Sequence, residues 1–253
     1  MIWLKTWRET RLRVYWSLLV LASAIALQLF TAPSTLHLLA TNPAAASRLM
    51  AFWTGSGLTP ANSTPSEMWW RVYLPMTNIF ATMITILLAG SGINTQTAYG
   101  MRQGVHPSML YTLSLPVPRW KWVAARAGLG LAATAAFVLI LLAIPPALAP
   151  VTGGQFAWSV VVAAAAPLFF STVVFYALTV WLASFLDELW QGMFSLLAVF
   201  GAVGVEVSLH TKTPGLFPYM PGSPPSFGGA VFCAALSAVF LCAAIVIVNR
   251  REF

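Results

Sequence analysis

The sequence predicts an all-α membrane protein in which six helices cross the bilayer and both termini face the cytosol. Of the 253 residues, 59% are hydrophobic and only 8% are charged, and the mean hydropathy is +0.80. A soluble domain of this length would need far more charge on its surface. The apolar residues also fall into six long runs, and most basic residues lie between those runs on one predicted side of the membrane.

Each apolar run is long enough to cross a hydrocarbon core of roughly 30 Å, which takes about 20 helical residues. Little sequence is left for a soluble domain, so residues 1–253 are expected to form a single transmembrane domain. The predicted spans are Tyr15–Leu36, Val72–Ala98, Ala127–Ala149, Trp158–Leu186, Leu189–Leu209 and Phe227–Val248.

Residues 1–14, ahead of the first run, intersperse aromatic and aliphatic residues with basic ones. This pattern favours a short amphipathic helix in the plane of the inner interface, with Trp3 and Trp7 among the lipid headgroups. The alternative is an ordinary basic flank ahead of a first span.

The net charge of +7 is explained by topology. With both termini in the cytosol, only Arg48, Arg71 and Lys212 lie outside, which follows the positive-inside rule. The chain is therefore expected in the cell (cytoplasmic) membrane as a multi-pass protein with no nucleic-acid partner. The basic residues on the inner side are Lys5, Arg8, Arg11, Arg13, Arg102, Arg119, Lys121, Arg126, Arg250 and Arg251.

The spans carry no motif for catalysis, metal binding or nucleotide binding. The three histidines, His37, His106 and His210, have no metal-ligand spacing. The Gly-rich pieces at Gly90 and Gly128 are not followed by the Lys and Ser/Thr of a phosphate-binding loop. The chain by itself is thus not expected to be an enzyme or to bind a cofactor or metal.

Polar residues within the spans leave two interpretations open. They either line a pathway or form hydrogen bonds between helices, as polar side chains commonly do in lipid. These residues are Gln28, Asn78, Thr82, Thr85, Ser171, Thr172 and Thr179. In the third run, small residues recur at a spacing of four and favour close helix packing, either within one subunit or between two: Ala124, Gly128, Ala132 and Ala136.

Glu206 is the one acidic residue within a predicted span. It lies three residues before the end of its run at Leu209, where the insertion cost is below the roughly 2.5–3.5 kcal/mol of the bilayer centre. It either has a structural role, facing water or pairing with a neighbour, or lines an exit. The Pro-rich loop that follows is either a stiff cap over that exit or a plain surface loop. The candidate exit-gate residues are Glu206, His210, Phe217 and Tyr219.

The connection between the second and third runs carries the most specific pattern. Residues 99–126 read YGMRQGVHPSMLYTLSLPVPRWKWVAAR and are basic. The stretch resembles the permease subunits of type-2 ABC transporters, in which a polar helix with a Gly precedes a leucine-leucine-x-leucine-Pro-Val-Ser-Arg run. Two positions depart from that pattern: Gln103 stands where Glu is frequent, and Pro118 replaces a small polar residue.

The resemblance implies that residues 99–119 form a cytosolic coupling segment, with a helix between Tyr99 and Leu113 that docks on a separate ATPase subunit. It also implies a second contact at the turn between the fourth and fifth runs, which on its residues alone is equally well a solvated turn. The implied ATPase-coupling residues are Arg102, Gln103, Gly104, Met109, Leu110, Leu113, Arg119, Asp187 and Glu188.

The function implied is that of the membrane subunit of an ATP-driven exporter. Its expected partners are two ABC ATPase subunits, which would hold ATP and Mg, and a second permease copy or a homologous permease. The alternatives are an ATP-independent secondary transporter or channel, which would need an ion-coupling carboxylate deep in the bilayer, and a membrane-embedded enzyme, which would need a catalytic set. Neither feature is found in the sequence, and the sequence does not identify a substrate.

Overall fold

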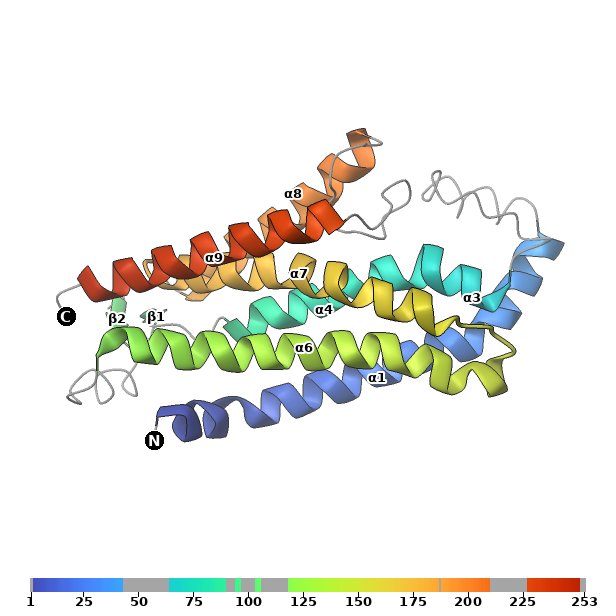
Figure 1. The fold of residues 1–253 in the computed structure, drawn as a ribbon, viewed down its shortest axis with the longest axis horizontal. Coiled ribbons are helices and arrows are strands. Elements are labelled where there is room, and N and C mark those ends of the chain that lie inside the picture. The colour runs from blue at the N-terminus through green and yellow to red at the C-terminus, as the bar shows by residue number, and fades with distance from the viewer. Residues whose placement is uncertain are drawn as a thin grey trace.

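The computed structural model describes residues 2–42, 64–89, 94–96, 103–105, 118–186, 188–209 and 227–250. Within these ranges the chain is almost entirely helical (Figure 1). The predicted all-α class is confirmed, apart from one small antiparallel ribbon. The elements in chain order are α1 (Ile2–Thr41), α3 (Pro65–Met68), η1 (Trp69–Tyr73), α4 (Leu74–Ala89), β1 (Asn94–Gln96), β2 (Gln103–Val105), α6 (Arg119–Thr152), α7 (Trp158–Ala183), α8 (Glu188–Leu209) and α9 (Phe227–Arg250).

Five helical stretches among the described residues are long and apolar enough to cross a membrane, which fits a multi-pass membrane protein. They correspond to the first, second, third, fourth and sixth predicted spans. The fifth predicted span is α8, whose apolar stretch Leu189–Val205 is shorter than the others. The five stretches are Thr10–Leu38, Pro65–Ala89, Val123–Thr152, Trp158–Ala183 and Gly228–Arg250.

The second span begins and ends earlier than the predicted Val72–Ala98. Its helix starts at Pro65, where a capping box forms: the Glu67 amide donates to Thr64 Oγ1 at 3.3 Å, and the Thr64 amide donates to Glu67 Oε2 at 3.0 Å. Pro65 suits the first helical position because it has no N–H to leave unpaired. The helix ends at Ala89, and β1 follows within the range predicted as helical, whereas its predicted end at Ala98 lies outside the described residues. Hydropathy alone misplaced this span because a polar cap, not an apolar residue, starts the helix.

The expected boundary between an in-plane helix and the first span is absent. Helix α1 is continuous from Ile2 to Thr41 and passes through residue 14 without a break. The Trp7 and Tyr15 rings pack edge to face across this boundary, with centroids 5.9 Å apart. No Gly or Pro precedes Pro33 in α1, so nothing in the chain interrupts the helical hydrogen bonds.

The helices lie alongside one another, and the chain's described ends, Ile2 and Arg250, lie at the same end of the bundle as β1 and β2 (Figure 1). We call this the ribbon end. Helix α1 packs mainly on α6, and α7 packs on α9, α6, α4 and α8. Helix α7 is therefore the central helix, and many of its side chains are buried.

The helices meet through three groups of buried apolar side chains. The largest joins α1, η1, α4, α6 and α7 and is centred on fully buried large side chains: Ile25, Leu29, Trp69, Leu74, Phe137 and Leu168. A second group joins α4, α6, α7 and α9 at the ribbon end, and a third joins α4, α7, α8 and α9. Because lipid is as apolar as these side chains, close packing rather than water exclusion must hold the helices together.

Helices α6 and α7 are in tight contact at Gly130. A Cβ built at Gly130 would overlap the ring of Tyr176, a side chain that is almost completely buried. The predicted small-residue stripe is not this contact: Ala124, Gly128 and Ala136 are only partly buried and Ala132 is exposed.

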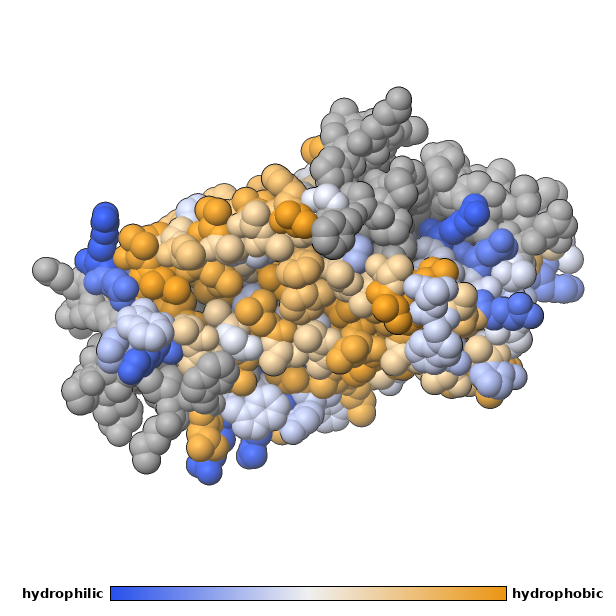
Figure 2. Space-filling model, viewed as in Figure 1, coloured by the Kyte–Doolittle hydropathy of each residue, from blue (hydrophilic) through white to orange (hydrophobic). Residues whose placement is uncertain are grey.

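The outer surface carries a belt of apolar side chains, with polar side chains gathered toward both ends (Figure 2). Exposed apolar residues occur on most long helices and include Leu27, Leu139, Val162, Leu197 and Val239. A water-soluble protein rarely exposes an apolar surface of this extent. The belt is thus suited to contact with lipid chains.

Candidate functional site

The ribbon end brings together the two connections that the sequence singles out. Strand β1 belongs to the connection between α4 and α6, and it contacts α8, which begins after the turn that follows α7. The ribbon itself pairs Asn94 with Val105, Thr95 with Gly104 and Gln96 with Gln103. The two connections implied to contact an ATPase are therefore neighbours in the fold.

Part of the predicted coupling segment can be placed. Gln103 and Gly104 lie in β2, so this part of the segment is extended and not helical. Arg119 is the first residue of α6 and Glu188 is the first residue of α8. The remaining predicted coupling residues lie outside the described residues: Arg102, Met109, Leu110, Leu113 and Asp187.

Basic side chains concentrate at the ribbon end. Three arginines on α1 are exposed, and Lys121 is exposed with its Nζ 5.8 Å from the centroid of the Trp120 ring. The exposed basic side chains that the structure describes here are Arg8, Arg11, Arg13, Lys121 and Arg250. At the opposite end, the described residues include Arg71 and Glu67, which have opposite charges. Figure 2 shows the corresponding hydrophilic patches beyond the apolar belt.

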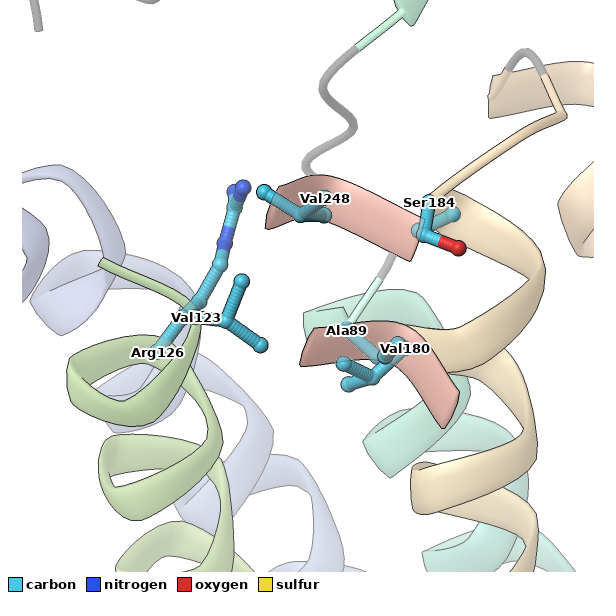
Figure 3. Close-up of a pocket in the computed structure, with 8 residues that line it drawn as sticks. Ala89, Val123, Arg126, Val180, Ser184 and Val248 are labelled. Atoms are coloured by element: carbon cyan, nitrogen blue, oxygen red, sulfur yellow. The ribbon is translucent and has the colours of Figure 1, made fainter. Parts of the chain in front are cut away.

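A small pocket lies at the ribbon end between α4, α6, α7 and α9 (Figure 3). Its walls are apolar except for Arg126 and Ser184, and the Arg126 side chain extends from α6 toward the side where the strands lie. The volume of about 20 Å³ is room for one water molecule. It is too small for a transported molecule. The other lining residues are Ala89, Val123, Val180, Ala183, Ala244 and Val248.

Next to this pocket, Tyr176 connects α7 to α6 through a hydrogen bond. Its hydroxyl donates to the backbone carbonyl oxygen of Arg126 at 3.0 Å. Gly130, one turn further along α6, leaves the space that the ring needs. Sequence inspection missed this junction, and its only signal was a glycine within an otherwise good helix, where glycine lowers stability unless packing requires it.

Several of the polar residues within the spans connect neighbouring helices. Thr77 Oγ1 donates to Gln28 Oε1 at 2.9 Å between α4 and α1, and Thr172 Oγ1 donates to Asn78 Oδ1 at 3.2 Å between α7 and α4. Both hydroxyls also donate to a carbonyl one turn earlier, Thr77 to Tyr73 O at 2.7 Å and Thr172 to Leu168 O at 2.9 Å. Other polar residues donate within their own helix: Thr82 to Asn78 O at 2.8 Å, Thr85 to Thr82 O at 2.7 Å and Ser171 to Leu168 O at 2.9 Å. In this structure the interhelical interpretation therefore accounts for Gln28, Asn78 and Thr172.

A double-mutant cycle on Asn78 and Thr172 tests this structural role. We expect Asn78→Leu and Thr172→Val to be non-additive, with a coupling free energy of about 0.6 kcal/mol, the usual size for such a bond in a membrane protein. Reversible unfolding in mixed detergent micelles measures it. Additive effects on stability, combined with a change in transport, would instead assign these side chains to a pathway.

Of the candidate exit residues, Glu206 can be placed, and it belongs to the opposite end of the bundle. Helix α8 starts at the ribbon end and runs away from it (Figure 1), so Glu206 lies near the far end, three residues before the helix ends at Leu209. The other members of the set, His210, Phe217 and Tyr219, lie outside the described residues. The predicted coupling residue Glu188 and the predicted exit residue Glu206 are thus separated by most of the length of α8.

Comparison with known proteins does not identify a relative. No family model matches the chain, and neither the curated proteins nor the solved structures include a significant match. What the chain does must therefore be inferred from its own residues and their arrangement.

Proposed function

We propose that this chain is the membrane-spanning subunit of an ATP-driven exporter of the type-2 ABC class. In the assembled transporter, two such subunits, identical or homologous, sit on two ATPase subunits. The ribbon end faces the cytosol, the basic first turns of α1 lie at the inner membrane surface, and α8 completes a set of six spans. The polypeptide contributes the pathway, and its partners bind ATP and Mg.

The contact between β1 and α8 is the observation that best supports this proposal. An ATPase that moves during its cycle must push on the membrane subunit where several helices can respond. At the ribbon end, the connection after α4 touches the first part of α8, and α7 leads into the same region. A single docked partner can therefore act on α4, α7 and α8 together.

The distribution of basic side chains also supports a cytosolic location for the ribbon end. Basic residues near span ends stay on the cytosolic side during insertion, and short connections follow this rule most strictly. The exposed side chains of Arg8, Arg11 and Arg13 on α1 and of Arg250 on α9 all lie at this end. An anionic inner leaflet would attract them further.

The mechanism proposed is alternating access. ATP binding draws the two ATPases together, and the docked connections carry that movement into α4, α7 and α8. Nucleotide can only favour the outward-open state by binding it more tightly than the inward-open state. The far end of α8, which carries Glu206, would then open the exit.

Co-purification tests the proposal directly. The full chain, tagged at one terminus and expressed in its native host, should be extracted in mild detergent with an ATPase that carries a phosphate-binding loop, in equal stoichiometry. Mass spectrometry identifies the partner, and an ATPase assay shows whether the complex turns over. A folded, monodisperse preparation that reproducibly lacks such a partner would contradict the proposal and favour a self-contained transporter or enzyme.

A further inference from the structure

Gln191, in the first turn of α8, is a buried amide with unmet hydrogen-bonding capacity. Its side chain is completely buried, and neither Nε2 nor Oε1 has a hydrogen-bond partner. This end of α8 is not buried on all sides, because the neighbouring Leu189 and Trp190 are 58% and 44% exposed. A glutamine so close to a helix end could extend to the surface, yet its amide points into the bundle.

An unsatisfied buried amide is unfavourable, and both of its polar ends count. The NH₂ group needs acceptors and the carbonyl oxygen needs a donor, so each lost bond carries a desolvation penalty. Native proteins leave few such groups, and each one calls for a partner. A methionine or leucine would fill the same space without that penalty.

A second polar group lies one turn along the same face of α8. Ser195 is completely buried, and its Oγ accepts from Thr179 Oγ1 at 3.0 Å. The Thr179 hydroxyl also donates to Phe175 O at 2.7 Å, so its single proton is shared between two acceptors, and Ser195 Oγ keeps a lone pair that can accept from a further donor. Gln191 and Ser195 are four residues apart, the spacing that places side chains one above the other on a helix.

We propose that Gln191 and Ser195 form a binding site for an ordered water molecule inside the ribbon end of the bundle. The ligand has to be small and neutral, and it has to accept from the NH₂ group while donating to the amide oxygen or to Ser195 Oγ. Water has this chemistry, and buried waters usually make about three such bonds. Through Ser195 and Thr179, the water connects the start of α8 to α7. This site is independent of the proposed transport function.

Thermal unfolding of the purified full chain in detergent provides the first test. Gln191→Met keeps the length of the side chain and removes both polar ends. We expect it to lower Tm by about 2–4 °C, the shift expected for the loss of roughly one hydrogen bond in a chain of this size. The matched control is Gln155→Met, at an exposed glutamine outside the helices, which should leave Tm unchanged. A higher or unchanged Tm in Gln191→Met would show that the amide has no partner and would overturn the site.

The second test separates a shared water from a general loss of packing. Ser195→Ala should lower Tm in the same direction, and the double variant should lose less than the sum of the two single variants. An experimental structure that resolves ordered waters should show one within hydrogen-bond distance of both Gln191 and Ser195 Oγ. Additive losses, or an amide paired with a protein or lipid group in that structure, would refute the proposal.

Discussion

Replacing Gly130 with alanine is expected to lower the stability of the protein by about 1–3 kcal/mol, the usual cost of overpacking a well-packed core. The new Cβ would overlap the Tyr176 ring, so α6 and α7 must separate or the ring must leave its place. Moving the ring also endangers the 3.0 Å hydrogen bond from Tyr176 to Arg126 O. For a chain of this length the change corresponds to a fall in Tm of roughly 2–12 °C. Thermal unfolding in detergent measures it.

Gly201 provides a matched control for the Gly130 substitution. It also lies within a long helix, but a Cβ there meets no atom within 4 Å. Gly201→Ala should therefore leave Tm unchanged or raise it slightly, since alanine favours helix more than glycine does. Replacing the Tyr176 ring with a smaller side chain should relieve the overlap. The double variant Gly130→Ala with Tyr176→Leu should therefore lose much less stability than the two single variants together. Equal effects at Gly130 and Gly201 would show that helix propensity, not the ring contact, is being measured.

The helices were predictable from the sequence because burial in lipid requires long apolar runs. Their boundaries were less predictable, because they depend on local hydrogen bonds. The second helix starts at the capping box of Thr64 and Glu67, in a stretch that hydropathy assigns to a loop. The continuous α1 shows the opposite effect: a change from basic to apolar composition suggested a boundary where the backbone has none.

Packing partners could not be predicted at all from spacing. The small-residue stripe of the third run suggested a contact face, yet the close approach occurs at Gly130, outside that stripe. Which glycine lies opposite a ring depends on the rotation of both helices. That rotation is set by many contacts over both helices and not by any four residues.

The candidate coupling site was likewise predictable only in part. The sequence predicts that Gly104 and Glu188 belong to two connections on the same side of the membrane. It does not reveal that β1 contacts α8, because this depends on how the connection after α4 folds back against the bundle. The ribbon also limits the proposed coupling helix, since Gln103–Val105 is strand. A helix within the coupling segment must therefore lie on one side of these residues.

The double substitution Met109→Asp with Leu110→Asp is expected to detach the ATPase that we propose as the partner. The resemblance places both apolar residues in the ATPase contact, and charges cannot replace apolar anchors in a desolvated interface. Loss of one such anchor weakens binding by about 2 kcal/mol or more, so affinity should fall by more than about tenfold. Membrane insertion and folding of the chain should be unaffected, because both positions lie between the end of α4 and the start of α6 in the sequence. Partner stoichiometry after purification and ATPase turnover are the measurements.

The control adds the same charge at the other end of the bundle. Thr41 and Asn42, at the end of α1, are exposed there, so Thr41→Asp with Asn42→Asp should keep the partner and its turnover. Equal losses in both variants would point to an effect of charge on insertion or assembly. If instead the Met109 and Leu110 variant retains the ATPase at full stoichiometry and turnover, the coupling contact is assigned to the wrong residues. The co-purification of the unmodified chain then decides between the two remaining possibilities: with a bound ATPase the contact lies elsewhere at the ribbon end, and without one the exporter proposal itself fails.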